Sequence, residues 1–354
     1  MISSAGSKET RTMLLNIGPS HPAMHGVIRL ITELDGETVS KVEAEIGYLH
    51  RAFEKSCENS SWTQAIPYTD RLNYVSPLIN NFGYCGAVEK LLGITLTPRC
   101  EYIRVIMSEI SRITDHLTCI AASAMELGAM TAFLYLMKAR EYLYDIIEEV
   151  TGARLTISYG RIGGVKGDLP AGFEEKTEKA LVKTEKEIRE VDKLLTRNRI
   201  FVDRTRDVGV LTKEDALSYA ITGPLGRASG INYDVRKAFP YFAYDRVDFE
   251  VPLGERGDNY DRYLVRMEEM RQSIRIIRQS IKDLPGGPVS VDAAGKAIRS
   301  FDLVDQAKMG DTAGLVHAVS TVEPTLEGSE GPFHAPSDPQ RSLSITIASS
   351  PSSA

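Results

Sequence analysis

Three long segments of this 354-residue chain repeat mostly apolar residues at intervals of three and four positions. Such residues fall on one face of an α-helix, because 3.6 residues complete a turn. The pattern therefore predicts long helices that bury one face each, as in a bundle. The repeats are Ile103, Ile106, Ile110, Ile113 and Leu117; Leu181, Thr184, Ile188, Val191 and Leu195; and Tyr260, Tyr263, Met267, Met270, Ile274, Ile277 and Ile281.

Local signals set the limits of these helices. The third helix is expected to begin after Gly257-Asp258 and to end before Pro285, because aspartate caps helix starts and proline cannot continue a helix. Residues 174–199 are dense in Lys and Glu around their apolar repeat. This composition predicts a partly solvated helix with ion pairs on its outer face.

The chain reads differently near its start. Residues 27–34 and 39–46 form two runs rich in apolar residues, separated by Asp35-Gly36-Glu37. An Asp-Gly pair between two such runs is a hairpin signal. The predicted fold class is therefore α+β, mainly α, with an N-terminal antiparallel β element on a helical bundle.

Composition excludes some classes of function. Charged residues make up 25% of the chain and the formal net charge is -6, which argues against a nucleic-acid partner. The four cysteines, Cys57, Cys85, Cys100 and Cys119, include no C-x-x-C pair. A zinc knuckle or a cysteine-ligated cluster within this chain is therefore not expected.

One short loop carries two histidines. Residues 18–26 read GPSHPAMHG, and their prolines and glycines predict a fixed turn rather than a helix. A rigid loop that holds His21 and His25 could deliver protons near neutral pH. Alternatively, the histidines only satisfy backbone carbonyls. A zinc site is disfavoured, because Pro22 keeps His21 out of the α region and no acid of the H-E-x-x-H type lies between the histidines.

Eight strings stand in order along the chain. They are GPSHPAMHG (18–26), EIGYLHRAFEK (45–55), YTDRLNY (68–74), EYIRVIMSEISRITDHL (101–117), MELGAMT (125–131), RIGGVKGDLP (161–170), RASGINYDVRKAFPY (227–241) and VPLGERGDNYDRYLVRMEEMRQS (251–273). Together they resemble one family, the D subunit of the bacterial proton-pumping NADH–quinone oxidoreductase, respiratory complex I, whose fold is related to nickel–iron hydrogenase large subunits. The similarity runs from about residue 12 to about residue 290.

The resemblance implies an enzyme subunit, part of an NADH:quinone oxidoreductase and translocase. Such a subunit helps to form the cavity where quinone takes electrons from an Fe–S cluster in a neighbouring subunit. Quinone is the substrate, and the Fe–S clusters and FMN belong to partner subunits, so this chain alone binds no cofactor. The implied partners are the Fe–S cluster subunit, a partner of the C-subunit type and a membrane-arm subunit. The implied location is peripheral, on the cytoplasmic side of the bacterial inner membrane.

The resemblance also assigns roles to residues. His25 and Tyr74 correspond to the family's ligands of the quinone headgroup and are the implied catalytic residues. His21 and Glu126 are implied in quinone binding or proton relay, Arg71 is implied to lie near the partner's Fe–S cluster, and no metal ligand is implied. Quinone reduction adds two electrons and two protons, so each carbonyl oxygen needs a hydrogen-bond donor as negative charge develops. Histidine and tyrosine can donate and then be reprotonated.

An alternative for Tyr74 is a core tyrosine on the helix that follows it. The chain also departs from the family pattern in four ways. Glu126 stands where aspartate is usual, residues 154–158 lack a common histidine, and His21 is a loop-shaping residue before it is a ligand. After about residue 314, the family's C-terminal strings are not found.

These departures leave alternatives for function. One is a degenerate scaffold paralogue of the same complex that lacks full activity because of its altered C-terminus. A nickel–iron hydrogenase is excluded, because that enzyme needs two C-x-x-C pairs as metal ligands.

The expected domain organisation has three parts. Residues 1–11 are a flexible N-terminus, residues 12–314 form the quinone-reactive, hydrogenase-large-subunit-like domain, and residues 315–354 are a divergent tail. The tail is expected to be disordered, because residues 329–354 combine four prolines with many serines and offer little apolar surface to bury.

Overall fold

The computed structural model describes residues 12–22 and 24–291. The described residues divide into two compact units, an N-terminal unit that ends at Phe53 and a helical unit that begins at Glu54. The predicted flexible N-terminus, residues 1–11, and the predicted tail, residues 315–354, lie outside the described residues. The single domain expected over residues 12–314 stays a prediction.

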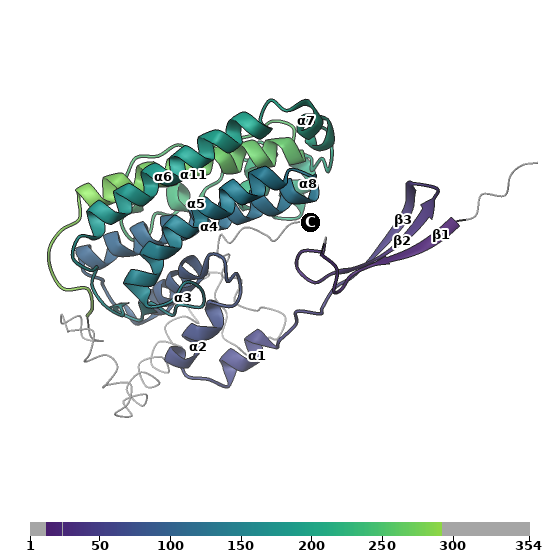
Figure 1. The fold of residues 1–354 in the computed structure, drawn as a ribbon. Coiled ribbons are helices and arrows are strands. Elements are labelled where there is room, and N and C mark those ends of the chain that lie inside the picture. Colours follow the sequence, from purple (N-terminus) through teal and green to yellow (C-terminus); the bar gives the residue numbers. More distant parts are fainter. Residues whose placement is uncertain (1–11, 23, 292–354) are drawn as a thin grey trace, which may run out of the picture. The chain divides into compact units, whose positions relative to one another are not determined.

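The N-terminal unit contains a three-stranded antiparallel sheet in the order β1-β2-β3 (Figure 1). The predicted hairpin is confirmed, with strands β2 (Arg29–Asp35) and β3 (Thr38–Glu45) joined at Gly36, whose φ is +62°. Glycine suits this turn because a positive φ costs it little. Strand β1 (Thr12–Ile17) was not predicted and pairs with the outer edge of β2, from Thr12 opposite Asp35 to Ile17 opposite Leu30.

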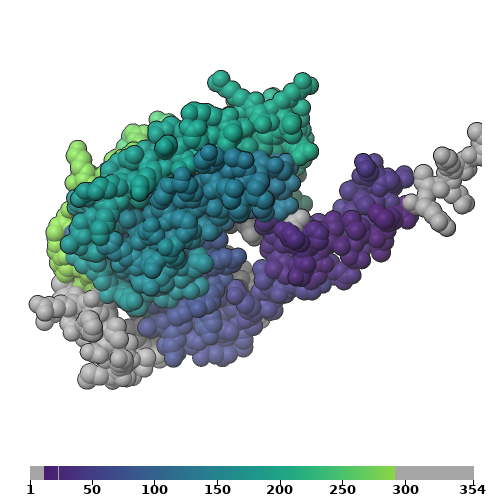
Figure 2. Space-filling view, viewed as in Figure 1, coloured from purple at the N-terminus to yellow at the C-terminus, as the bar shows by residue number. Residues whose placement is uncertain are grey.

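This sheet buries almost nothing within its own unit. In the space-filling view its strands form a thin, extended ribbon (purple in Figure 2). Apolar side chains on β1 and β3, including Met13, Leu14, Val39 and Val42, are at least half exposed. Among the described residues of the N-terminal unit, only Thr32 is buried. The sheet is therefore held by its backbone ladder rather than by a core.

The helical unit is built around four long helices, α4, α5, α6 and α11, which lie side by side (Figure 1). The three apolar repeats of the sequence lie on α4, α6 and α11, so the predicted α+β, mainly α fold is confirmed. The elements are α1 (Phe53–Glu58), α2 (Trp62–Thr69), α3 (Pro77–Leu92), α4 (Pro98–Glu126), α5 (Met130–Thr151), β4 (Gly160–Arg161), β5 (Gly164–Val165), α6 (Phe173–Leu195), α7 (Arg199–Thr205), α8 (Lys213–Ser218), α9 (Gly223–Ala228), α10 (Val235–Ala238), the 3-10 turn η1 (Tyr244–Arg246) and α11 (Asn259–Lys282).

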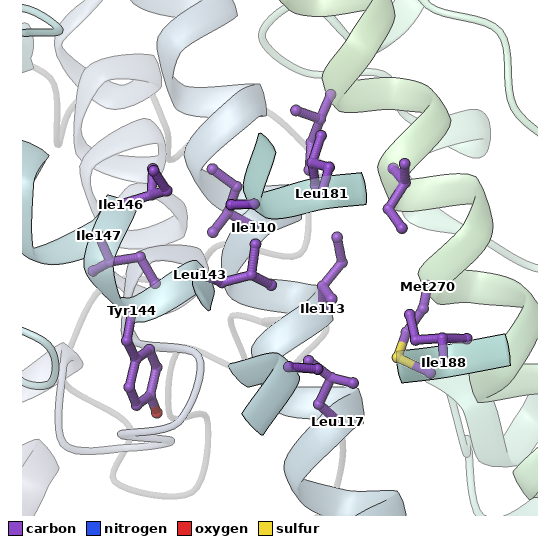
Figure 3. Close-up of a cluster of buried hydrophobic side chains, with 14 of the residues drawn as sticks. Ile110, Ile113, Leu117, Leu143, Tyr144, Ile146, Ile147, Leu181, Ile188 and Met270 are labelled. Carbon is purple, nitrogen blue, oxygen red and sulfur yellow. The ribbon is translucent and has the colours of Figure 1, made fainter. Parts of the chain in front are cut away.

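The core lies where these helices face one another. Side chains from all four helices meet in one buried cluster (Figure 3). Burying each large apolar side chain of this kind contributes about 1.5–3 kcal/mol. The cluster therefore stabilises the helices that hold the neighbouring loops in position. Its members include Ile110, Ile113 and Leu117 of α4, Leu143 and Ile147 of α5, Leu181 and Ile188 of α6, and Met270 of α11.

The predicted limits of α11 are also confirmed. The Asp258 carboxylate accepts a hydrogen bond from the Asp261 backbone at the start of the helix, and the helix ends at Lys282, before Pro285. On α6, the exposed ion pairs Glu175–Lys179 and Glu190–Lys193 bear out the predicted solvated face. Such exposed helix pairs contribute only about 0.3–0.5 kcal/mol each.

Candidate functional site

Tyr74 lies in the loop of residues 70–76, between α2 and α3. Its side chain is 59% exposed, and α3 begins only at Pro77. The interpretation of Tyr74 as a core residue on the following helix is therefore wrong. A proline at the first helical position marks where a helix starts, so Pro77 was the signal that Tyr74 precedes it.

Helix α4 fixes this loop on both sides of Tyr74. The Asn73 side-chain amide donates to Asp115 Oδ1 over 3.1 Å, and the Thr114 hydroxyl donates to the Val75 carbonyl over 3.1 Å. Since Thr114 and Asp115 are consecutive residues of a buried helix, they hold the loop backbone in place. The loop thus presents an exposed phenol on a rigid support.

The start of the loop is fixed by a buried carboxylate. Asp70 is fully buried, and its Oδ2 accepts from the Ser158 backbone N–H over 2.8 Å and from the Ser158 hydroxyl. Burial raises the pKa of Asp70, although these hydrogen bonds oppose the shift. The adjacent Arg71 is exposed, and its Nη1 donates to the Pro67 carbonyl over 2.7 Å. Asp70 therefore joins the loop of Arg71 and Tyr74 to the segment before β4.

That segment is the one in which the sequence lacks the family's common histidine. Thr156 and Ser158 have φ values of +45° and +40°, in the left-handed region that β-branched and other non-glycine residues rarely adopt. Each such residue costs on the order of 1–3 kcal/mol and persists only where its surroundings impose it. Here the Asp70 carboxylate, which binds both donors of Ser158, is part of that constraint.

A buried ion pair supports the β4–β5 hairpin that follows. Arg104 is completely buried, and its Nη2 lies 2.6 Å from Glu89 Oε1 and donates to the carbonyl oxygens of Arg161 and Gly164. Glu89 in turn accepts from the Gly163 backbone over 2.7 Å. Sequence reasoning missed Glu89, Arg104, Asp70 and Ser158. No local pattern marks them, because their partners lie 15 to 88 residues away.

The histidine loop is a turn, as predicted. The Met24 backbone N–H donates to the His21 carbonyl over 3.0 Å. Gly18 has a φ of +92°, and a Cβ placed there would lie 2.0 Å from the Ile28 carbonyl oxygen, so only glycine fits. His21 and His25 are exposed. Within the described residues, no three or more His, Cys, Asp or Glu side chains are grouped so that they could hold a metal ion.

The candidate residues are divided between the two units. His21 and His25 belong to the N-terminal unit, and Arg71, Tyr74 and Glu126 to the helical unit, so the expectation that His25 and Tyr74 face one cavity stays a prediction. Glu126 is the last residue of α4, eleven residues after Asp115. Eleven residues of helix span about 16 Å at about 1.5 Å each. Glu126 thus lies about three helical turns beyond the residue that anchors the Tyr74 loop.

Comparison with known proteins decides the family. The family model described as the 49 Kd subunit of respiratory-chain NADH dehydrogenase matches residues 126–337. A relative from Myxococcus xanthus, named as the D subunit of NADH-quinone oxidoreductase, is 56% identical over 284 residues, which cover 80% of this chain and 68% of the relative. This chain belongs to that family. The resemblance found in the sequence is thereby confirmed, and the family is that of a subunit of an oxidoreductase complex, complex I.

Other relatives agree in name and extent. A protein from Anaeromyxobacter sp. (strain Fw109-5), named as a second D subunit of NADH-quinone oxidoreductase, is 56% identical over 282 residues, or 80% of this chain and 65% of that protein. The D subunit from Pelobacter propionicus is 55% identical over 280 residues, or 79% of this chain and 70% of its own length. The chain thus spans about two thirds of the length of these relatives. Over the ranges that the structure describes, no helix combines the length and apolar character that a bilayer crossing requires.

Proposed function

We propose that this chain is the quinone-binding subunit of a proton-pumping NADH–quinone oxidoreductase. Two observations support the proposal: membership of the 49 Kd subunit family, and the exposed phenol of Tyr74 on a loop that α4 holds from both sides. In the complex, quinone would take electrons from an Fe–S cluster in a neighbouring subunit. The chain would sit peripherally on the cytoplasmic side of the membrane, with a partner of the C-subunit type and a membrane-arm subunit beside it.

The proposed chemistry assigns one donor to each unit. Tyr74 donates a hydrogen bond to one developing quinone oxyanion, and His25 donates to the quinone or reprotonates Tyr74. A tyrosine on a fixed loop is suited to this role, because a preorganised donor needs little rearrangement as charge develops. Glu126 and His21 would take part in proton relay.

Arg71 has a different part in the proposal. Its guanidinium is positively charged and offers several N–H donors, so it can stabilise negative charge near the partner's cluster. The buried carboxylate of the preceding Asp70 fixes the backbone at this point. Asp70 and Ser158 are then positioning residues for Arg71.

The test is made in the assembled enzyme. We expect His25→Ala and Tyr74→Phe each to lower quinone reductase turnover by about 10²-fold or more, as loss of one aligned donor does in other enzymes. NADH-to-ferricyanide activity should persist, because the artificial acceptor is reduced upstream of the quinone. Tyr219→Phe is the matched control, since Tyr219 is also an exposed tyrosine, 74% exposed at the end of α8, and should leave both activities unchanged.

The same measurements separate this function from the scaffold alternative. The alternative rests on the altered sequence after about residue 314, where the family's C-terminal strings are not found, whereas His25 and Tyr74 speak against it. A scaffold would assemble with its partners but support no quinone turnover even with the unaltered sequence. Equal loss of both activities in the two variants would instead indicate failed assembly and would contradict the proposed roles.

A further inference from the structure

A cluster of buried charged side chains lies in the helical unit. It joins α4, α9, α10 and α11 and includes arginines, carboxylates and a histidine, all less than one tenth exposed. A buried guanidinium needs acceptors for its N–H groups, because an unmet charged donor is costly to keep from water. The members are Glu109, Arg112, His116, Arg227, Asp234, Arg236 and Glu269.

Two of the carboxylates in this cluster already accept several hydrogen bonds. Glu109 accepts from Arg236 Nη1, from the Tyr244 hydroxyl and from the Ser273 hydroxyl, over 3.0, 2.6 and 2.6 Å. Asp234 accepts from the Arg236 backbone, Nε and Nη2 over 2.9, 3.0 and 2.6 Å. Arg236 thus donates from all three of its guanidinium nitrogens, and little acceptor capacity of Glu109 and Asp234 remains for the neighbouring arginines.

Two arginines keep N–H groups for which the described residues offer no acceptor. Arg112 donates only through Nε, to Glu109 at 3.2 and 3.3 Å. Arg227 donates through Nε to Glu269 over 2.6 Å and through Nη1 to the Tyr233 carbonyl over 3.2 Å. Within the described part of the chain, Nη1 and Nη2 of Arg112 and Nη2 of Arg227 therefore have no hydrogen-bond partner, although both residues are about 95% buried.

These arginines line one small cavity. Its volume is about 40 Å³, and its wall also includes Thr222, Asp234 and Arg236. A single water needs about 10–15 Å³ on this measure, so the cavity holds a group of roughly three heavy atoms. A carboxylate group has that size and presents two oxygens, which match the paired N–H groups of a guanidinium.

We propose that this cavity binds one carboxylate group through the free Nη groups of Arg112 and Arg227. The carboxylate oxygens accept from Arg112 in the bidentate manner, and Arg227 Nη2 donates a further bond. Asp234 also faces the cavity, but Arg236 neutralises it through the bonds given above. The site is independent of the proposed quinone chemistry, because none of its residues is assigned to that reaction.

Formate is the probe, since it is the smallest carboxylate. We expect the purified full chain at neutral pH and low chloride to broaden the NMR signal of ¹³C-formate saturably, with one site per chain. Pivalate, whose trimethyl group exceeds the cavity, should not compete. Arg112→Lys should bind formate about tenfold more weakly, because an ammonium cannot offer the paired N–H fork. Arg112→Gln should abolish binding, and Arg140→Gln, a charge-matched control on α5, should leave it unchanged.

Any of three results would overturn the proposal: no saturable formate binding to the unaltered chain, competition by pivalate, or equal formate binding by the unaltered chain and by Arg112→Lys. If Arg112→Gln does not fold, Arg112→Lys and the pivalate comparison still decide the question. Repeating the titration on the assembled oxidoreductase identifies the source of the carboxylate. If the assembled enzyme no longer binds formate, the cavity is filled by the carboxylate of a protein side chain. If formate still binds, the natural ligand is a free small carboxylate.

Discussion

At the scale of single residues, Glu109 links buried charge to stability. Burial alone would raise the pKa of Glu109, but Arg112 and Arg236 lower it to about 2, from an ordinary value of 4.5. A carboxyl whose pKa is lowered on folding stabilises the fold above its unfolded pKa. That contribution is lost as the pH falls through the folded value.

We therefore expect the free energy of unfolding to fall between pH 4.5 and pH 2, in part through protonation of Glu109. In Glu109→Gln this pH dependence should be shallower, although the variant is less stable at pH 7 because Arg112 and Arg236 lose a charged acceptor. Urea unfolding at a series of pH values from about 5 to about 3 measures the slope. Glu174→Gln, a change at an exposed carboxylate of α6 that forms none of the ion pairs described above, should keep the slope of the unaltered chain, and equal slopes in all three proteins would contradict the prediction.

Residues also show where sequence reasoning reaches its limit. The turn that holds His21 and His25 could be predicted, because prolines and glycines act locally. The exposure of Tyr74 could have been inferred from Pro77, which marks the start of α3. The hydrogen bonds from Ser158 to Asp70 could not have been predicted. They join residues 88 positions apart, and Ser158 adopts a left-handed backbone conformation that serine does not favour. Buried pairs such as Arg104–Glu89 look like surface charges in a sequence.

At the scale of elements, the start of α11 depends on one side chain. Asp258 is fully buried, and its carboxylate accepts from the Asp261 backbone and from the Asp207 backbone, each over 2.8 Å. Asp258→Ala should lower the free energy of unfolding by about 1–2 kcal/mol, the cost of losing a strong helix cap. Chemical denaturation of the variant measures this loss. Asp203→Ala, a change at an exposed aspartate of α7, should cost less than about 0.5 kcal/mol.

The elements that could be predicted are those whose signals are local. The apolar repeats predicted α4, α6 and α11 correctly. The expectation that each helix buries one face is wrong for α4, which is buried on all sides from Tyr102 to Leu117. The β2–β3 hairpin followed from Asp35-Gly36. Strand β1 was missed because residues 18–28 separate it from β2, and this connection is longer than the hairpin loops of about two to five residues that indicate strand pairing. The short helices α8 to α10 carry too few turns to show a period.

At the scale of the whole molecule, the two units differ in what stabilises them. Over the described residues, the apolar clusters of the helical unit are built from residues 78 to 289. The N-terminal sheet has only Thr32 buried and exposes apolar side chains on β1 and β3. A sheet of three strands needs a buried hydrophobic face to be stable alone. Exposed apolar groups of this kind are typical of surfaces that other proteins cover.

The helical unit should be stable without the N-terminal sheet. A chain of residues 51–354 keeps α1 and every residue of the helical clusters, so it should unfold cooperatively with a thermal midpoint within a few degrees of the full chain. A peptide of residues 1–50 should show no stable β-sheet in water, because its backbone ladder gains no burial to offset the entropy of ordering. Circular dichroism on both fragments measures the outcome. A large fall in the midpoint of the 51–354 chain would show that the helical unit depends on the N-terminal sheet for its stability. A cooperative transition in the peptide would show that the sheet is stable alone.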